Sequence, residues 1–203
     1  MKRVLIQVPE GLKKNFLEIA EDFESQGYVP ILSVDTCYGA CDVAGAEAKR
    51  LGCEKIVHYG HSDLGIKTEV PVEYMEYHIE YDPTKTLQKF SELFKEFDAV
   101  GLVTTVQYLD SLRAVKGFFE SSSKKVLIGK STKKCGAKHA GQILGCDATA
   151  ATSVEDKVGC FLFIGSGKFH HFGINTKKPV FVLDVEKNSI EQAKNNERLE
   201  RQR

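Results

Sequence analysis

Short apolar runs alternate with helical segments along this chain, and the whole alternation occurs twice. The first series of apolar runs covers residues 3–8, 29–34, 55–59 and 70–75. The second series covers residues 99–104, 125–129, 160–164 and 180–183. Strands that alternate with helices are typical of parallel sheets covered by helices. We therefore expect an α/β chain of tandem repeated small domains, each with a mostly parallel sheet of about four strands flanked by helices.

The two series meet near Tyr81, where a new helical segment begins. In each half a Gly-containing segment follows the third apolar run, and the fourth run starts with a Pro-Val pair, Pro71-Val72 and Pro179-Val180. Such self-similarity indicates a divergent repeat. We expect a first domain over residues 1–80, a second over residues 81–185, and a charged helical tail over residues 186–203.

Each half also places a cysteine beside Gly and Asp, between its second and third apolar runs. These are Cys41, in Tyr38-Gly39-Ala40-Cys41-Asp42, and Cys146, in Gly145-Cys146-Asp147. We expect Cys41 where a loop enters a helix, a position that favours the thiolate, which is the form that binds metals. Free cysteine is often a buried apolar residue, but a core cysteine has no reason to recur beside Gly and Asp. We interpret Cys41 and Cys146 as metal ligands that face a shared centre.

The remaining cysteines have simpler interpretations, with one exception. Cys160 lies inside an apolar run and is expected in the core, Cys53 sits on a turn, and Cys135 lies in a polar loop. The exception is Cys37, which forms a Cys-x3-Cys pair with Cys41 and could be half of a zinc site. No second close pair completes that site.

Several polar and glycine-rich segments follow the predicted strands. In an open parallel sheet, ligands bind at the carboxyl ends of the strands. Backbone N–H groups of a glycine-rich loop can closely approach an anionic group there. His61 and His170 are candidate ligands or proton carriers, although loop histidines bonded to the backbone are equally compatible with the pattern. The segments are Pro9-Glu10-Gly11, Gly60-His61-Ser62 and Gly165-Ser166-Gly167.

Charge and hydropathy exclude some classes of function. The 28 Lys and Arg residues balance the 28 Asp and Glu residues, so nothing indicates direct nucleic-acid binding. No apolar run approaches the roughly 18 residues that a membrane span needs, and no signal peptide is recognisable at the start. We expect a cytoplasmic protein without a membrane partner, in which the six cysteines are ligands, redox groups or core residues rather than disulfides.

Five segments together resemble the archaeal diphthamide synthase family, the 2-(3-amino-3-carboxypropyl)histidine synthase subunit. They occur in the family's order and reach from the first predicted strand to near the end of the second repeat. The segments are Val8-Pro9-Glu10-Gly11-Leu12, Tyr38-Gly39-Ala40-Cys41-Asp42, Gly60-His61-Ser62, Gly141-Gln142-Ile143-Leu144-Gly145-Cys146 and Phe163-Ile164-Gly165-Ser166-Gly167-Lys168-Phe169-His170.

This resemblance implies three similar α/β domains, each giving one cysteine to a central 4Fe-4S cluster. It implies reductive cleavage of S-adenosylmethionine (SAM) and radical transfer of its 3-amino-3-carboxypropyl group to a histidine of translation elongation factor 2. That transfer is the first step of diphthamide biosynthesis. By the matching motifs, Cys41 and Cys146 are the ligands of the first two domains. The expected SAM contacts are Glu10, Gly11, Gln142, Gly165, Ser166, Gly167 and His170.

The chain departs from the family because the third domain and its cysteine are absent, so that residues 186–203 look like the start of a missing third domain. The third ligand then comes from another polypeptide or from Cys135 or Cys37, or it is missing because the chain is a fragment. We expect a homodimer or a heterodimer. The competing interpretations are a non-catalytic scaffold or partner subunit of the enzyme, and a protein that binds zinc through Cys37 and Cys41.

Overall fold

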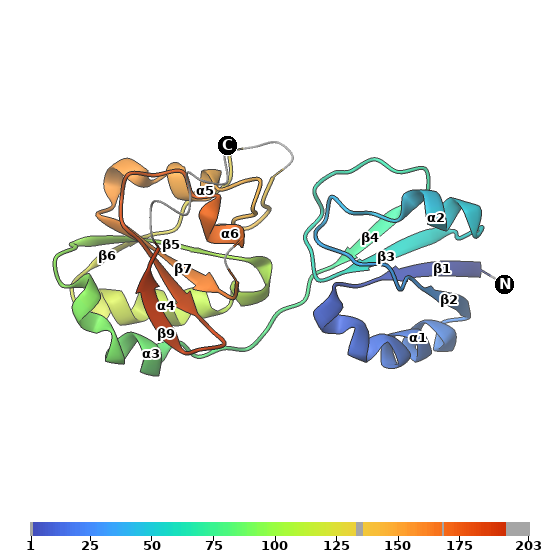
Figure 1. Ribbon diagram of the computed structural model, residues 1–203, viewed down its shortest axis with the longest axis horizontal. Coiled ribbons are helices and arrows are strands. Elements are labelled where there is room, and N and C mark those ends of the chain that lie inside the picture. The colour runs from blue at the N-terminus through green and yellow to red at the C-terminus, as the bar shows by residue number, and fades with distance from the viewer. Residues whose placement is uncertain (1, 133–135, 168, 194–203) are drawn as a thin grey trace. The chain divides into compact units, whose positions relative to one another are not determined.

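Two sheets, one in each half of the chain, organise the computed structural model, which describes residues 2–132, 136–167 and 169–193 (Figure 1). The chain separates into two compact units, residues 1–77 and 78–203. Each unit has its own sheet and its own apolar core. Parallel strands must be joined by long crossovers, and this is why helical segments separate the apolar runs. The expected class of tandem α/β repeats with mostly parallel sheets is confirmed.

The first unit contains a sheet of parallel strands in the order β2-β1-β3-β4. Its strands are β1 (Lys2–Gln7), β2 (Tyr28–Leu32), β3 (Lys55–Tyr59) and β4 (Val72–Met75). A 3-10 turn (Glu10–Asn15) leads into α1 (Phe16–Ser25), and α2 (Gly45–Arg50) follows β2. The α1 side of the sheet buries Val4, Ile6 and Val57, whereas the α2 side buries Leu5 and Ile56. Both faces of this sheet are therefore covered, as in Figure 1.

The second unit repeats this arrangement and adds an edge strand. The strand order is β6-β5-β7-β8-β9, in which β9 alone is antiparallel to its neighbour among the described strands. Its strands are β5 (Ala99–Thr104), β6 (Lys125–Leu127), β7 (Cys160–Gly165), β8 (Val180–Asp184) and β9 (Ser189–Gln192). Its helices are α3 (Thr84–Lys89), α4 (Ser111–Ser121), α5 (Thr149–Thr152) and α6 (Phe169–Phe172), with 3-10 turns at Ser91–Phe94, Val106–Tyr108 and Glu155–Lys157.

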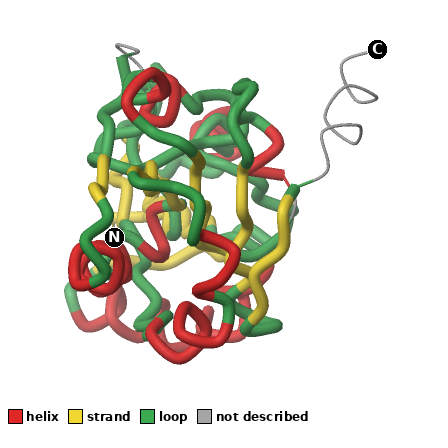
Figure 2. The backbone as a smooth tube through the Cα atoms, turned by 90° about the vertical axis from the view of Figure 1, so that its left-hand side faces the viewer, coloured by secondary structure: helices red, strands yellow, loops and turns green. Residues whose placement is uncertain are grey.

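Two apolar clusters cover the two faces of this second sheet, and Figure 2 shows helices on both sides of the strands. Leu87 of α3 and Val115 of α4 pack on one face with Leu162 of β7. Ala151 of α5 packs on the opposite face with Phe161. Alternate residues of a strand point to opposite faces, so β7, which is buried along its whole length, serves both clusters. In the described part of the chain, no helix has the length and apolar character that a membrane span requires.

The prediction of a helical tail is wrong for Ser189–Gln192, because these residues form strand β9. The Asp184 carboxylate accepts hydrogen bonds from the backbone N–H groups of Glu186 and Lys187, and Asn188 adopts a positive φ of 48°. The chain therefore reverses into a hairpin and buries Ile190 in the core. The sequence did not predict this strand because Ile190 is its single apolar residue and the residues around it are polar or charged. Residues 194–203 lie outside the described residues.

Candidate functional site

Cys41 is an exposed thiol on a loop that several hydrogen bonds hold in place. The Asp42 carboxylate accepts a bond of 3.2 Å from the Tyr38 N–H, and the Asp42 carbonyl accepts one of 2.7 Å from the Gln7 amide. The Tyr74 hydroxyl donates to the Ala40 carbonyl at 3.2 Å. Helix α2 begins only at Gly45, so Cys41 precedes the helix instead of lying in its first turn. The loop, rather than the helix dipole, presents the thiol.

Cys146 is also exposed, and the carboxylate of Asp147 organises the segment around it. Asp147 accepts hydrogen bonds from the Ser131 hydroxyl at 2.5 Å, from the Ala137 N–H at 3.0 Å, and from the Thr149 N–H and hydroxyl at 3.0 and 2.6 Å. Burial raises the pKa of Asp147, but the bonds from Ser131, Thr149 and Ala137 outweigh burial and bring it to about 2. Asp147 is thus an ionised anchor beside an exposed thiol.

The Cys146 loop contacts the segment that follows β7. A Cβ on Gly145 would come within 2.1 Å of the Phe169 ring, and one on Gly173 would come within 2.8 Å of the Gly145 carbonyl oxygen. Glycine is required where two segments approach this closely. The structure thereby brings the Cys146 loop next to Phe169 and Gly173, which belong to the glycine-rich segment that follows β7.

The residues expected to bind SAM in this segment differ in accessibility. Gly165 is buried at the end of β7, Ser166 and His170 are half-buried, and Gly167 is exposed with a φ of +68°. Burial lowers the pKa of His170, so its imidazole is neutral near pH 7. A cavity of about 370 Å³ adjoins this segment. Its lining includes Gly167, His171, Asp184, Glu186 and Lys187, of which sequence analysis identified only Gly167.

The other expected SAM contacts lie elsewhere. Glu10 and Gly11 are exposed in the 3-10 turn after β1, where Glu10 pairs with Lys13. Gln142 is fully buried, and its amide oxygen accepts hydrogen bonds from the Lys138 and His139 N–H groups at 2.9 and 3.0 Å. Gln142 therefore holds the loop before Cys146, and its contact with SAM stays a prediction.

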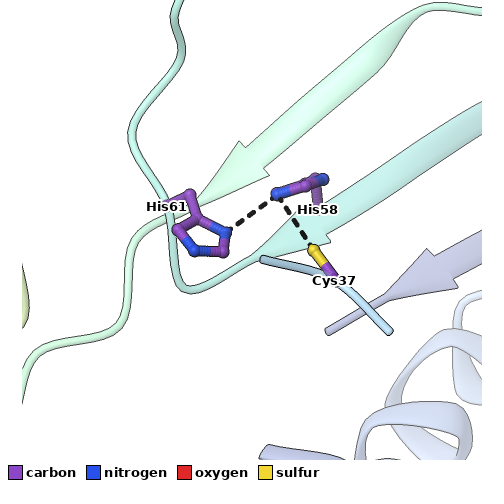
Figure 3. A group of neighbouring side chains, drawn as sticks. All are labelled: Cys37, His58 and His61. Carbon is purple, nitrogen blue, oxygen red and sulfur yellow. Dashed lines mark hydrogen bonds between the residues drawn. The ribbon is translucent and has the colours of Figure 1, made fainter. Parts of the chain in front are cut away.

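Three potential metal ligands lie together in the first unit, and the sequence did not predict that Cys37 and His61 meet at His58 (Figure 3). Cys37 Sγ lies 3.7 Å from Nε2 of His58, and that Nε2 lies 2.9 Å from Nδ1 of His61. Burial raises the pKa of Cys37 to about 11. Burial, followed by the charge of His61, lowers the pKa of His58 to about 4. The sequence suggested Cys41 as the partner of Cys37, and His58 was assigned only to a buried strand. The His-x2-His spacing of His58 and His61 is the signal that could have identified the group.

The other cysteines are placed as expected where the structure describes them. Cys160 is fully buried within β7, and burial raises its pKa to about 12. Cys53 is buried against α2, and burial raises its pKa as well. Both thiols are therefore unreactive core residues. Cys135 lies outside the described residues.

Comparison with known proteins finds one family repeatedly. A family model described as a diphthamide synthesis protein matches residues 8–203. The 2-(3-amino-3-carboxypropyl)histidine synthase of Pyrococcus horikoshii is 35% identical over 186 residues, which are 90% of this chain and 53% of that protein. Subunit 1 of the human enzyme (Homo sapiens) is 31% identical over 176 residues, covering 83% of this chain and 38% of that protein. The chain spans about half the length, or less, of these relatives.

Solved structures agree with these relatives. The crystal structure of Dph2 from Pyrococcus horikoshii superimposes with a TM-score of 0.85 at 33% identity, covering 99% of this chain and 58% of that one. A second structure of that protein, determined with a 4Fe-4S cluster, matches with the same TM-score and identity and has 59% of its chain covered. The fold of this chain is therefore similar to the corresponding part of a protein that has been solved with an iron–sulfur cluster.

Proposed function

The chain belongs to the diphthamide synthesis protein family, and we propose that it supplies two cluster ligands of a 2-(3-amino-3-carboxypropyl)histidine synthase. The proposed activity is the first step of diphthamide biosynthesis, the transfer of the 3-amino-3-carboxypropyl group from SAM to a histidine of translation elongation factor 2. This proposal rests on a feature that occurs in both units. Cys41 and Cys146 are exposed thiols, each on the loop that follows the second strand of its unit.

The donor set fits an iron–sulfur cluster in part. Fe–S clusters are held by cysteine thiolates, and both loops present a thiol to solvent while the neighbouring Asp side chain holds the backbone. When bound, the cluster would supply the electron that cleaves the bond between the SAM sulfur and its aminocarboxypropyl carbon. Cys37 is buried and faces two histidines. We therefore propose that the third thiolate comes from the region of the enzyme that corresponds to the part of the relatives outside the match to this chain.

We propose that SAM binds at the carboxyl edge of the second sheet, beside Gly165, Ser166, Gly167 and His170. The adjoining cavity of about 370 Å³ lies within the usual size range of ligand pockets, about 300–1,000 Å³. Its Asp184 and Glu186 carboxylates suit the SAM ammonium group. Its Lys187 and the Gly167 backbone N–H suit the SAM carboxylate. Glu10, Gly11 and Gln142 remain candidate contacts.

Cluster loading tests the ligand assignment. The chain is reconstituted anaerobically with iron and sulfide, with the remaining part of the enzyme supplied, and iron and acid-labile sulfide are measured. We expect bound iron to fall strongly in Cys41→Ala and in Cys146→Ala. The matched variants Cys53→Ala and Cys160→Ala should keep it, because those thiols are buried in the core. Unchanged iron in Cys41→Ala and Cys146→Ala would contradict the assignment.

The name of one relative supports an assembly of subunits. The human relative is named as subunit 1 of its enzyme, and we propose that this chain also works in the cytoplasm as part of a homodimer or heterodimer. A non-catalytic partner subunit is the alternative. Transfer of labelled aminocarboxypropyl from SAM to elongation factor 2 separates the two. Loss of transfer in Cys41→Ala, with assembly intact, supports the catalytic role, whereas full transfer by that variant supports the scaffold role.

A further inference from the structure

We propose that Cys37, His58 and His61 form a zinc-binding site in the first unit, separate from the exposed thiol of Cys41. The three ligand atoms all lie within 4.8 Å of one another, and Figure 3 shows them converging from β3, from the turn after it and from the loop after β2. One sulfur and two imidazole nitrogens are donors that zinc prefers. The proposal does not depend on the function proposed above.

The observed spacing fits a tetrahedral ion. Zinc bonds of about 2.3 Å to sulfur and about 2.0 Å to nitrogen separate tetrahedral ligand atoms by about 3.3–3.6 Å. The distance from Cys37 Sγ to His58 Nε2 is 3.7 Å, and that from His58 Nε2 to His61 Nδ1 is 2.9 Å. Small side-chain adjustments therefore admit the ion. Binding displaces the Cys37 thiol proton to solvent, and both histidines bind as neutral imidazoles.

A neighbouring side chain sets the tautomer that a zinc ligand needs. The Gln7 amide orientation follows from its backbone partners, because Nε2 donates to the Asp42 carbonyl and Oε1 accepts from the Ala44 N–H. The same Oε1 lies 3.1 Å from Nδ1 of His58, so Nδ1 must carry the proton that it donates. The lone pair of His58 then resides on Nε2 and faces Cys37 and His61. Metal-binding histidines usually show this second hydrogen bond.

The repeat shows that the fold does not need these polar groups. Gln7, His58 and Tyr74 are paired across β1, β3 and β4. The equivalent row of the second sheet, set by the same strand order and register, is Val103, Phe163 and Val182. Buried polar groups destabilise a core unless they are satisfied. The apolar row packs as core in the second unit, so the polar row of the first indicates a ligand site.

Backbone geometry brings the third ligand into place. Gly60 has a φ of +82°, which non-glycine residues rarely adopt, and its N–H donates to the Met75 carbonyl at 2.7 Å. This turn folds His61 back over the end of β3 toward His58. His61 is half-buried, whereas Cys37 and His58 are buried. An ion can therefore enter from the His61 side, with water as its fourth ligand.

Zinc titration of the metal-free, reduced chain tests the site without iron present. We expect stoichiometric zinc in competition with a chromophoric chelator, and thiolate-to-metal absorption when cobalt replaces zinc. Affinity should fall at least about tenfold in Cys37→Ala and in His61→Ala. The matched variants Cys53→Ala and His78→Ala should bind as the parent does, since Cys53 and His78 lie outside the group. Cys41→Ala should also keep full affinity.

The outcomes are distinguishable. Circular dichroism of each variant verifies that it is folded. If Cys37→Ala is poorly folded, His61→Ala still tests the site, because His61 is only half-buried and its substitution disturbs the core less. Parent-like zinc affinity in folded His61→Ala overturns the proposal. Loss of zinc in Cys41→Ala with retention in His61→Ala also overturns it, in favour of a Cys37–Cys41 pair. Neither result bears on iron loading at Cys146, so the two proposals fail independently.

Discussion

At the scale of the residue, the Asp that follows each exposed cysteine positions the loop. Asp42 accepts a hydrogen bond from the Tyr38 N–H, whereas Asp147 accepts four from three residues around it. Several N–H and O–H hydrogen bonds to one carboxylate stabilise its ionised form. The Cys-Asp pair thus combines an accessible thiol with an anchor, and the anchor is stronger in the second unit.

Asp147→Asn should weaken the second unit in a pH-dependent manner. The pKa of Asp147 is lowered from 3.8 to about 2 in the folded chain. Its ionised form therefore adds about 2 kcal/mol of stability above pH 4, which is lost as the pH falls from about 4 to 2. Urea unfolding at pH 7 should show Asp147→Asn less stable than the parent, and the difference should shrink at pH 3.

The matched control for that experiment is Asp156→Asn. Asp156 is exposed in a short 3-10 turn, and its substitution should leave unfolding unchanged at both pH values. A constant difference between Asp147→Asn and the parent from pH 7 to pH 3 would show that the ionised carboxylate is not the anchor.

At the scale of the element, buried strands were predictable and their polar exceptions were not. The sequence predicts a strand over residues 55–59 because the apolar, β-branched Ile56 and Val57 lie there, and the structure places β3 at these residues. The same apolar context concealed His58 and Gln7, since periodicity cannot show which buried position is polar for a ligand. Strand β9 was missed for the converse reason, because Ile190 is its single inward-facing apolar residue.

Gly145→Ala should displace the Phe169 ring from the Cys146 loop. A Cβ there would lie 2.1 Å from the ring, but Phe169 is 67% exposed and can swing outward. We expect a loss of about 1 kcal/mol, the lower end of the range for overpacking. Adding Phe169→Ala should remove most of this cost, which a double-mutant cycle by urea unfolding measures. Equal costs of Gly145→Ala with and without Phe169 would contradict the contact.

Gly117→Ala should stabilise helix α4. Gly117 is exposed in the helix interior, and a Cβ there would meet nothing within 4 Å. Alanine favours a helix over glycine by about 1 kcal/mol, so the free energy of unfolding should rise by roughly that amount. Urea unfolding measures the change, and a loss of stability would show that this helix position is constrained by a contact.

At the scale of the whole molecule, one strand order occurs in both units. The order β2-β1-β3-β4 recurs as β6-β5-β7-β8, and each unit presents an exposed cysteine after its second strand. The repeated cysteines were predictable because Gly and Asp recur beside them. The histidine and cysteine group of the first unit was not, because it has no counterpart among the described residues of the second unit and its members come from two separate segments.

The proposed shared cluster requires that Cys41 and Cys146 converge in the assembled enzyme. Thiolates on one Fe–S cluster meet at a small centre, so we expect their sulfur atoms within roughly 7 Å of each other. A short thiol-specific bifunctional reagent should join them in the cluster-free enzyme, with the remaining part supplied. The cross-link, mapped by mass spectrometry, should persist in Cys53→Ala and vanish in Cys41→Ala and Cys146→Ala. Loading with iron and sulfide should block the reaction, because both thiolates are then bound to iron. A cross-link that forms equally before and after loading would show that the two cysteines do not share the cluster.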